Sequence, residues 1–430
     1  MKTLVYGRPE WRRYLAGLPR SSAPRAEVVR AAERIVRAVR TGGDQALVRL
    51  TRRLDGVSLT ASRLRVRPRE IRALAARADR GLVAALREMG GRIEDYHRRQ
   101  LGNGFRIELP DGSLIEEVVR PVASAGLYVP GGSGAYPSSV LMNAIPAKVA
   151  GVGRLVVVTP PRALESSPAV AAALLIAGVD EHVFRIGGAQ AVAALAYGTR
   201  SVPAVDRVVG PGNAFVTAAK RLVRGQVEID SEAGPSEVVV LADSSADAGW
   251  VAADLLAQAE HGSGFETVVL VTPSRELAGE AARLVGEGLS SVANARAARR
   301  ALGRHGAVVL VRDLDEGVDA VNALAPEHVE VLTRGADRLA RRITAGAVFV
   351  GPFSPVAVGD YGIGPNHVLP TGGSARFSSP LGVRDFQRRH SVVRMSEAGL
   401  ARVAEGVVRI ALAEGFRGHA QSVLTRFEGE

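Results

Sequence analysis

Apolar residues recur at helical spacing over the first quarter of the chain. Between residues 26 and 101 they stand three and four positions apart, which predicts amphipathic helices. The clearest examples are Val28, Val29, Ala32, Ile35 and Val36. Gly42-Gly43 followed by Asp44 indicates the end of one helix and the N-cap of the next, and a second helical run covers 69–99. This opening region is expected to be a helical layer.

The pattern changes near residue 114, where short β-branched runs begin to alternate with alanine-rich helical segments. Strands are predicted at 154–158, 183–186, 207–209, 237–241, 267–271, 307–311, 329–332 and 347–350. Helices are predicted at 169–177, 189–197 and 246–260, with others between the later strands. This alternation is typical of βαβ units with parallel sheets. We therefore expect an α/β protein with two such domains.

The segment 391–413 near the C-terminus reads as an amphipathic helix. It is followed by Glu414-Gly-Phe-Arg-Gly-His419. Because so short a segment cannot own a core, it is expected to dock on another surface.

Composition narrows the possible chemistry. The chain of 430 residues contains no cysteine, which excludes disulfides, thiolate zinc sites, iron–sulfur clusters and a cysteine nucleophile. The N-terminus has no apolar core of signal-peptide length. The longest apolar run is 169–179, shorter than the ~20 residues of a membrane span. We expect a cytoplasmic protein that does not bind membranes.

The net charge of +11 could indicate a nucleic-acid partner. However, residues 1–110 hold 25 Lys and Arg against 11 Asp and Glu, so the rest of the chain is nearly neutral. The arginines of this region lie on predicted helix faces beside glutamates, as solvated faces do. The charge therefore does not predict nucleic-acid binding.

Two glycine-rich turns could hold a nucleotide, although the standard dinucleotide and phosphate-loop fingerprints are missing. One is Gly126-Leu-Tyr-Val-Pro-Gly-Gly132. The other, Gly210-Pro-Gly-Asn213, lies between a predicted strand and a predicted helix, where backbone N–H groups favour an anion. A tight turn with a helix cap explains the second motif equally well.

Three further motifs carry polar groups suited to chemistry. Gln258 and His261 end a predicted helix at i, i+3, with Gly262 as its C-cap, and could bind a divalent metal, although His261 could instead interact with the last helix carbonyls. Glu327-His328 precedes a strand and combines a carboxylate with an imidazole, as acid–base chemistry near neutral pH requires; Glu-His pairs are also common on surfaces. The glycine-rich loop 360–373 presents polar side chains without building core, which indicates a functional loop.

Taken together, these segments resemble the histidinol dehydrogenase family. The matching segments run in family order from about residue 120 to the C-terminus, whereas the first 110 residues resemble the family only in helical character and length. The matching segments are Gly126-Leu-Tyr-Val-Pro-Gly-Gly132, 137–148, 186–191, Gly210-Pro-Gly-Asn213 with 214–216, 233–238, Gln258-Ala-Glu-His261-Gly262, Ala325-Pro-Glu327-His328, 359–371 and 414–419.

The resemblance implies an NAD-dependent, zinc-containing four-electron dehydrogenase. Such an enzyme oxidises L-histidinol through L-histidinaldehyde to L-histidine with two NAD⁺, in the last steps of histidine biosynthesis. The implied zinc ligands are Gln258, His261, Asp360 and His419. The implied bases are His328 for the alcohol proton and Glu327 for the attacking water. The implied NAD contacts are Tyr128, Gln190 and Asn213, and the implied substrate contacts are Ser236, His367 and Glu414 together with the zinc ligands and His328.

The resemblance also implies an architecture. The chain would contain two incomplete Rossmann-like domains and a C-terminal helical tail. The tail would be swapped between the subunits of a homodimer, so that His419 completes the partner's site. The expected division is an N-terminal arm at 1–24, a large domain at 25–127 plus 238–378, a second domain at 128–237 on the NAD side, and the tail at 379–430.

Two other functions stay open at this point. A related zinc- and NAD-dependent enzyme could oxidise another small polyol, such as a sulfonated diol, although Glu414 would repel a sulfonate. A basic nucleic-acid-binding protein is the remote alternative and rests on the net charge alone.

Overall fold

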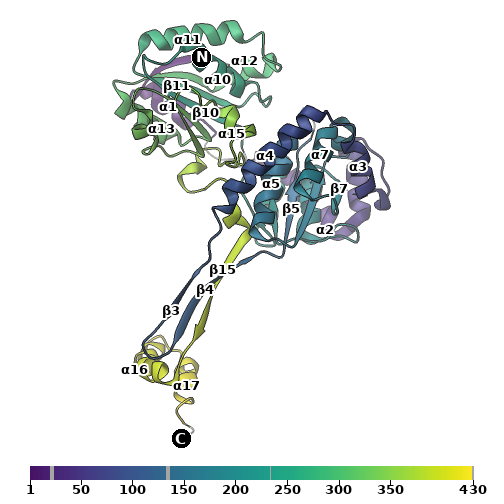
Figure 1. Cartoon of the computed structure of the whole chain (residues 1–430), viewed down its shortest axis with the longest axis vertical. Coiled ribbons are helices and arrows are strands. Elements are labelled where there is room, and N and C mark those ends of the chain that lie inside the picture. Colours follow the sequence, from purple (N-terminus) through teal and green to yellow (C-terminus); the bar gives the residue numbers. More distant parts are fainter. Residues whose placement is uncertain (20–23, 132–135, 233, 429–430) are drawn as a thin grey trace. The chain divides into compact units, whose positions relative to one another are not determined.

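The computed structural model describes residues 1–19, 24–131, 136–232 and 234–428 (Figure 1). The chain divides into two compact units. Unit 1 comprises Met1–Gln100 and Val122–Phe386, and unit 2 comprises Leu101–Pro121 and Gln387–Glu430. Within the described ranges, none of the helices combines the length and apolar character that a bilayer-spanning helix requires.

Unit 1 contains two six-stranded sheets, and the first, sheet 1, is entirely parallel with the order β1-β12-β11-β10-β13-β14. Its strands are β1 (Lys2–Val5), β10 (Glu237–Ala242), β11 (Thr267–Thr272), β12 (Gly306–Leu310), β13 (His328–Leu332) and β14 (Ala347–Val350). Its helices are α1 (Pro9–Gly17), α10 (Ala248–Ala259), α11 (Arg275–Gly288), α12 (Ala295–Arg304), α13 (Leu314–Leu324), α14 (Ala336–Ala340) and α15 (Val356–Tyr361). The strands predicted between 237 and 350 are confirmed. Their runs of valine and leucine suit strands that are covered on both faces.

Sheet 2 has the order β2-β7-β6-β5-β8-β9, with β2 antiparallel to β7 and the remaining neighbours parallel. Its strands are β2 (Arg65–Val66), β5 (Ser124–Tyr128), β6 (Arg154–Thr159), β7 (Val183–Arg185), β8 (Arg207–Val209) and β9 (Glu228–Ile229). Its helices are α5 (Pro137–Ala150), α6 (Ala163–Ser166), α7 (Pro168–Ala177), α8 (Gly188–Tyr197) and α9 (Ala214–Val223). The expectation of two α/β sheets is thus confirmed.

The N-terminal helices pack on sheet 2, which differs from the expected grouping of 25–127 with 238–378. They are α2 (Ala26–Asp55), α3 (Pro68–Ala75) and α4 (Arg80–Arg98). Val39 of α2 shares a buried cluster with Val192 of α8, and Ile93 of α4 shares another with Val140 of α5. The helical period predicts that a helix has a buried face but does not identify the sheet that covers it. Residues 2–5, expected in an arm, form β1 on the edge of sheet 1.

Gly43 interrupts α2 where the sequence predicted a break, with φ +47° and ψ −135°. Asp44 was predicted as an N-cap, but its carboxylate instead accepts hydrogen bonds from the backbone N–H and the hydroxyl of Ser201. The side chain therefore joins α2 to the loop after α8.

Unit 2 is a three-stranded antiparallel ribbon that carries two helices (Figure 1). Its elements are β3 (Phe105–Glu108), β4 (Leu114–Pro121), β15 (Gln387–Arg394), α16 (Glu397–Ala413) and α17 (Arg417–Leu424). The predicted helix over 391–413 is wrong for its first residues, because β15 pairs with β4 through Arg394. The helix begins only where the Ser396 hydroxyl accepts from the backbone N–H of Gly399.

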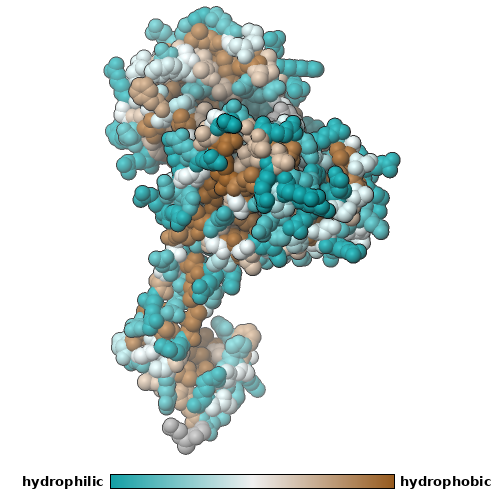
Figure 2. Space-filling model, turned by 45° about the vertical axis from the view of Figure 1, so that its right-hand side comes forward, coloured by the Kyte–Doolittle hydropathy of each residue, from teal (hydrophilic) through white to brown (hydrophobic). Residues whose placement is uncertain are grey.

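Apolar side chains are exposed over much of unit 2 and appear as brown surface in Figure 2. On the helices they are Val403, Val407, Ile410, Leu412 and Leu424, beside the helices Phe416 and Phe427, and on the ribbon Phe105, Ile107, Val392 and Val393. Only Gly399 and Ala411 of α16 are buried. An amphipathic helix with so little of its apolar face covered is typical of a helix that packs on another molecule.

Candidate functional site

His328 is the first residue of β13 and is almost fully buried. Its Nδ1 lies 3.1 Å from the backbone carbonyl oxygen of Glu237 at the start of the neighbouring strand β10. A carbonyl only accepts, so Nδ1 carries the proton and Nε2 keeps its lone pair. Burial lowers the pKa of His328 to about 3. The imidazole is therefore neutral at pH 7, with Nε2 free to accept a proton.

Glu327, immediately before β13, is held by a reciprocal pair of hydrogen bonds. Its Oε2 accepts from the backbone N–H of Glu237 at 2.9 Å, and Glu237 Oε2 accepts from the backbone N–H of Glu327 at 3.2 Å. Burial raises the pKa of Glu327 well above the ordinary value, with a smaller contribution from the Glu237 charge. Once ionised, this carboxylate is therefore a stronger base than an exposed one.

The side chains of Glu327 and His328 lie close together. Adjacent side chains within a strand point to opposite sides, yet Glu327 Oε2 lies 3.6 Å from His328 Nδ1. Glu327 precedes β13, so the alternation within the strand does not extend to it. The structure thus places both candidate bases at one point.

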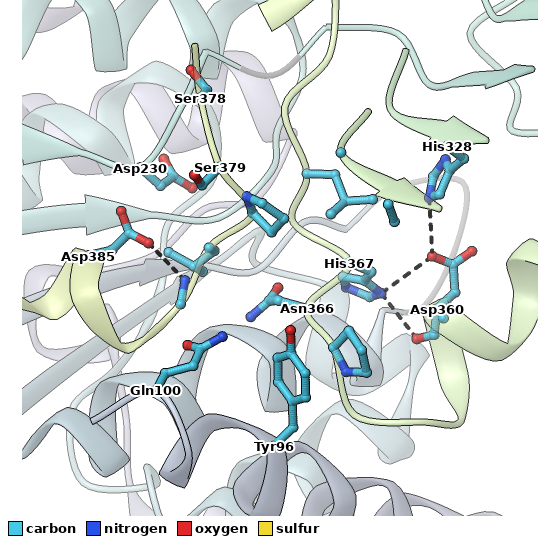
Figure 3. Close-up of a pocket in the computed structure, with 18 of the residues that line it drawn as sticks. Tyr96, Gln100, Asp230, His328, Asp360, Asn366, His367, Ser378, Ser379 and Asp385 are labelled. Atoms are coloured by element: carbon cyan, nitrogen blue, oxygen red, sulfur yellow. Dashed lines mark hydrogen bonds and ion pairs between the residues drawn. The ribbon is translucent and has the colours of Figure 1, made fainter. Parts of the chain in front are cut away.

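Asp360 and His367 lie beside His328, as Figure 3 shows. Asp360 Oδ1 is 3.9 Å from His328 Nε2 and 4.0 Å from His367 Nδ1, which also lies 3.2 Å from the Asp360 carbonyl oxygen. Burial raises the pKa of Asp360 to about 6 and lowers that of His367 to about 4. The loop 360–373 is anchored by Asn366, whose side-chain N–H donates to the Met142 carbonyl oxygen of α5 at 2.7 Å. The predicted functional loop thus contributes to a site with His328.

Gln258 lies in the last turn of α10, and His261 follows the helix. Gln258 is buried, and among the described residues its side-chain nitrogen has no hydrogen-bond partner. The helix ends at Ala259, so His261 lies in the following turn rather than on the helix. The prediction of Gly262 as the C-cap is wrong, because Glu260 is the C-cap; Gly262 does have a positive φ of +102°. His261 is close enough to Asp360 to lower its pKa, although burial outweighs this effect.

An amide, an imidazole and a carboxylate are donors that suit a borderline-soft divalent cation. The Gln258 side-chain oxygen would be the ligating atom, because the amide nitrogen only donates hydrogen bonds. Among the described residues, histidines and carboxylates alone do not form a metal-binding group of three. The donor set therefore depends on Gln258 together with a further ligand.

The candidate NAD contacts lie at the carboxyl edge of sheet 2. The strand order reverses between β5 and β8, and ligands of open parallel sheets bind at such a reversal. Tyr128 ends β5, Gln190 lies in the first turn of α8, and Asn213 caps α9. Tyr128 and Gln190 are buried, and the Gln190 side-chain oxygen has no partner. Asn213 is exposed, and its side-chain oxygen accepts from the backbone N–H groups of Phe215 and Val216.

A buried ion pair holds the glycine-rich turn after β8. Lys220 pairs with Asp230 and also donates to the carbonyl oxygen of Gly210 at 3.1 Å, while the backbone N–H of Gly210 donates to Asp230 at 2.8 Å. Gly210 has φ +113°, and a Cβ there would clash with the carbonyl oxygen of Tyr128. The turn is therefore rigid and requires glycine at this position.

A pocket of about 860 Å³ lies beside His328. Its lining includes His328, Asp360 and His367, and also Arg207 and Asp230 from the sheet 2 side. Its size suits a small molecule.

Known proteins were compared with the chain. A family model described as "Histidinol dehydrogenase" matches residues 18–427. The chain is 45% identical over 410 residues to the histidinol dehydrogenase of Syntrophotalea carbinolica, covering 95% of each chain. It is 47% identical over 400 residues to that of Halalkalibacterium halodurans, covering 92% of this chain and 93% of the relative.

The chain belongs to the histidinol dehydrogenase family. A crystal structure of histidinol dehydrogenase from Elizabethkingia anophelis superposes with a TM-score of 0.91 at 31% identity, covering 100% of this chain and 98% of the other. The resemblance inferred from the motifs is thus confirmed, and with it an NAD-dependent dehydrogenase family.

The remaining predicted residues of the family site are divided between the two units. Glu414 and His419 belong to unit 2 and are exposed. Ser236 belongs to unit 1 and is hydrogen-bonded to Glu327. Two quoted motifs include Gly132 and Ala233, which lie outside the described residues.

Three carboxylic acids near the site were missed by the sequence analysis. The backbone of Glu237 is hydrogen-bonded to both candidate bases. Glu330 and Asp254 form a second pair of acids. A signal was available for two of the three: Glu330 interrupts a buried apolar strand, and Asp254 lies in an apolar helix. Such positions seldom hold an unpaired acid.

Proposed function

We propose that the chain oxidises L-histidinol through L-histidinaldehyde to L-histidine with two NAD⁺, which are the last steps of histidine biosynthesis. The observation that carries this proposal is the family match over nearly the whole chain, combined with a buried neutral imidazole beside a carboxylate of raised pKa. A cytoplasmic location is part of the proposal.

His328 would take the alcohol proton in each oxidation. Its Nε2 is the available atom, because Nδ1 faces the carbonyl oxygen of Glu237. This hydrogen bond also fixes the ring, so no reorientation is needed when the proton arrives. NAD⁺, held by Tyr128, Gln190 and Asn213, supplies hydride acceptance when it is bound.

Glu327 would accept a proton from the water that attacks the aldehyde. The hydrate formed in this way bears two oxygens on the reacting carbon, so a hydride leaves it more readily than it leaves an aldehyde. The chain has no cysteine, so a thiohemiacetal route is excluded. The backbone N–H of Glu237 and the Ser236 hydroxyl would hold the carboxylate during this step.

We further propose that Gln258, His261 and Asp360 hold one zinc ion together with His419. Zinc would supply a centre that the imidazole and amine of histidinol chelate. Ser236, His367 and Glu414 would complete the substrate contacts beside the zinc ligands and His328, with the Glu414 carboxylate suited to a cationic amine.

The reaction is tested by its stoichiometry. We expect two NADH for each L-histidinol consumed, measured by absorbance with amino-acid analysis of the product. One NADH per substrate would mean an ordinary alcohol dehydrogenase, and turnover of a sulfonated diol in preference to histidinol would favour the related polyol enzyme. Salt-dependent retention on DNA is the corresponding test of the nucleic-acid alternative.

Glu327→Gln is expected to separate the two oxidations. Glutamine cannot accept the water proton, so acid formation should fall by about 10²–10⁴-fold, while the first hydride transfer changes little. Single-turnover NADH formation from histidinol, and from histidinaldehyde supplied directly, measures the two steps. The control is Glu316→Gln, which removes a carboxylate paired with Arg312 in the first turn of α13. Normal oxidation of histidinaldehyde by Glu327→Gln would remove the role given to Glu327.

The exposed apolar side chains of unit 2 support a homodimer with swapped tails. Ile410 of α16 and Phe416, which precedes α17, are more than half exposed, and both helices have little core of their own. Covering them with a second copy would remove apolar surface from water. In this arrangement His419 of one subunit completes the zinc site of the other.

Mixing two inactive variants, His261→Asn and His419→Asn, is expected to restore activity. Each heterodimer would contain one intact site, so a random mixture should reach about one quarter of the wild-type rate. The measurement is NADH formation after the two chains are unfolded and refolded together, with heterodimer confirmed by differently tagged chains. Heterodimers without activity would exclude the swap.

A further inference from the structure

Glu330 occupies the middle of β13 and is 1% exposed. Side chains alternate along a strand, so Glu330 lies on the same face as His328, two residues before it. Leu332, on this face, packs in the cluster that contains α10, whereas Val329 and Val331 pack in the cluster on the opposite face. The Glu330 carboxyl group therefore lies on the same face of β13 as the candidate catalytic imidazole, between the strand and the helices that cover this face.

Glu330 satisfies the first N–H of α15. Its Oε1 accepts from the backbone N–H of Val356 at 2.7 Å, and α15 has no hydrogen-bonding cap from its own side chains. A helix of six residues is too short to be stable alone, so its position depends on such tertiary contacts. Asp360 lies four residues after Val356 and therefore on the same side of α15. The contact from Glu330 fixes where the helix begins and hence where Asp360 lies.

Glu330 is also hydrogen-bonded to Asp254 of α10. Two carboxyl groups in contact cannot both ionise, so they must share a proton. Burial, with a smaller contribution from Asp254, raises the pKa of Glu330 to about 8. Among the described residues, no N–H or O–H group donates to the second oxygen of Glu330, which leaves this oxygen available for the proton shared with Asp254. Asp254 lies four residues before Gln258, on the same side of α10.

We propose that the hydrogen-bonded acids Glu330 and Asp254 are positioning residues that hold Gln258 and Asp360 at the spacing a shared metal ion requires. The contacts run from Asp254 on α10 through Glu330 on β13 to Val356 at the start of α15. Neither acid is proposed to contact the substrate. The proposal rests on the proposed function, in which Gln258 and Asp360 are zinc ligands. Residues that support metal ligands in this way contribute about 10–100-fold to metal affinity.

The test compares Glu330→Gln with Glu330→Met in the full-length chain. Glutamine can accept from Val356 and donate to Asp254, so its zinc affinity should stay within about threefold of wild type. Methionine fills the space but can do neither, so zinc affinity, measured by competition with a chelator, should fall by about 10–100-fold. Deuterium uptake in the metal-free chain, on a peptide covering Val356–Tyr361, should become at least ~10-fold faster in Glu330→Met alone.

A second variant keeps the test decisive if Glu330→Met does not fold. In Asp254→Ala, Glu330 still accepts from Val356, so exchange of α15 should not change, whereas zinc affinity should fall because the link to α10 is lost. Wild-type zinc affinity in either Glu330→Met or Asp254→Ala would overturn the proposal. If the wild-type chain binds no zinc at all, the proposed metal is wrong, and the exchange of α15 still decides whether Glu330 holds that helix.

Discussion

Replacing His328 with asparagine is expected to lower kcat by about 10²–10⁴-fold in both oxidations, the usual contribution of a general base. The reason is local. Asparagine can still donate to the carbonyl oxygen of Glu237, as Nδ1 does at 3.1 Å, but it has no basic atom in place of Nε2. Zinc content should not change, because His328 is not among the proposed ligands. Steady-state rates with histidinol and with histidinaldehyde, together with elemental analysis, measure both effects.

His182→Asn is a suitable control, since His182 lies in the loop before β7, away from the site. It should leave both rates unchanged. If His328→Asn retained one oxidation at the wild-type rate, the proton of that step would have to leave by another group. Glu327 would then be the first candidate, because its Oε2 lies 3.6 Å from His328 Nδ1.

His261→Asn is expected to remove zinc and, with it, the binding of histidinol. Asparagine is shorter than histidine and lacks the ring nitrogen, so the metal would lose a direct ligand. The affinity for zinc should fall by on the order of 100-fold or more, since even residues that only support ligands contribute 10–100-fold. Elemental analysis after gel filtration measures the metal, and calorimetry with histidinol measures the substrate.

Added zinc separates this variant from His328→Asn. Excess zinc should restore part of the activity of His261→Asn by mass action, whereas His328→Asn should not respond. A His261→Asn protein that retains one zinc per chain would contradict the ligand assignment and leave His261 as a residue that interacts with the end of α10.

The strands β6, β7, β8 and β10 to β14 were predictable, because each is a short run of β-branched and aliphatic residues with turn signals at its ends. The strands β1, β2, β5 and β9 were not predicted. The division into domains was not, since the apolar faces of α2 and α4 would suit either sheet. The error at 391–413 has a related cause: β15 is set by pairing with β4, more than 260 residues away in sequence. Periodicity describes a face of an element and says nothing about its partner.

The candidate site divides in the same way. Glu327-His328 was suggestive from its chemistry alone, and only the family resemblance joined it to Gln258 and Asp360. The contacts that tune the pair come from Glu237, which is 90 residues away. The pairing of Asp254 with Glu330 could not be predicted, because two acids far apart in sequence do not reveal that they share a proton.

The two sheets of unit 1 place their candidate residues at opposite ends of their strands. In sheet 2, Tyr128 and Asn213 follow the carboxyl ends of β5 and β8, whereas in sheet 1 His328 and Glu237 begin β13 and β10. The carboxyl edge of sheet 1 therefore carries none of the proposed chemistry. Apart from the turn before α15, which positions Asp360, the turns at this edge therefore offer places to insert a tag or a probe without disturbing catalysis.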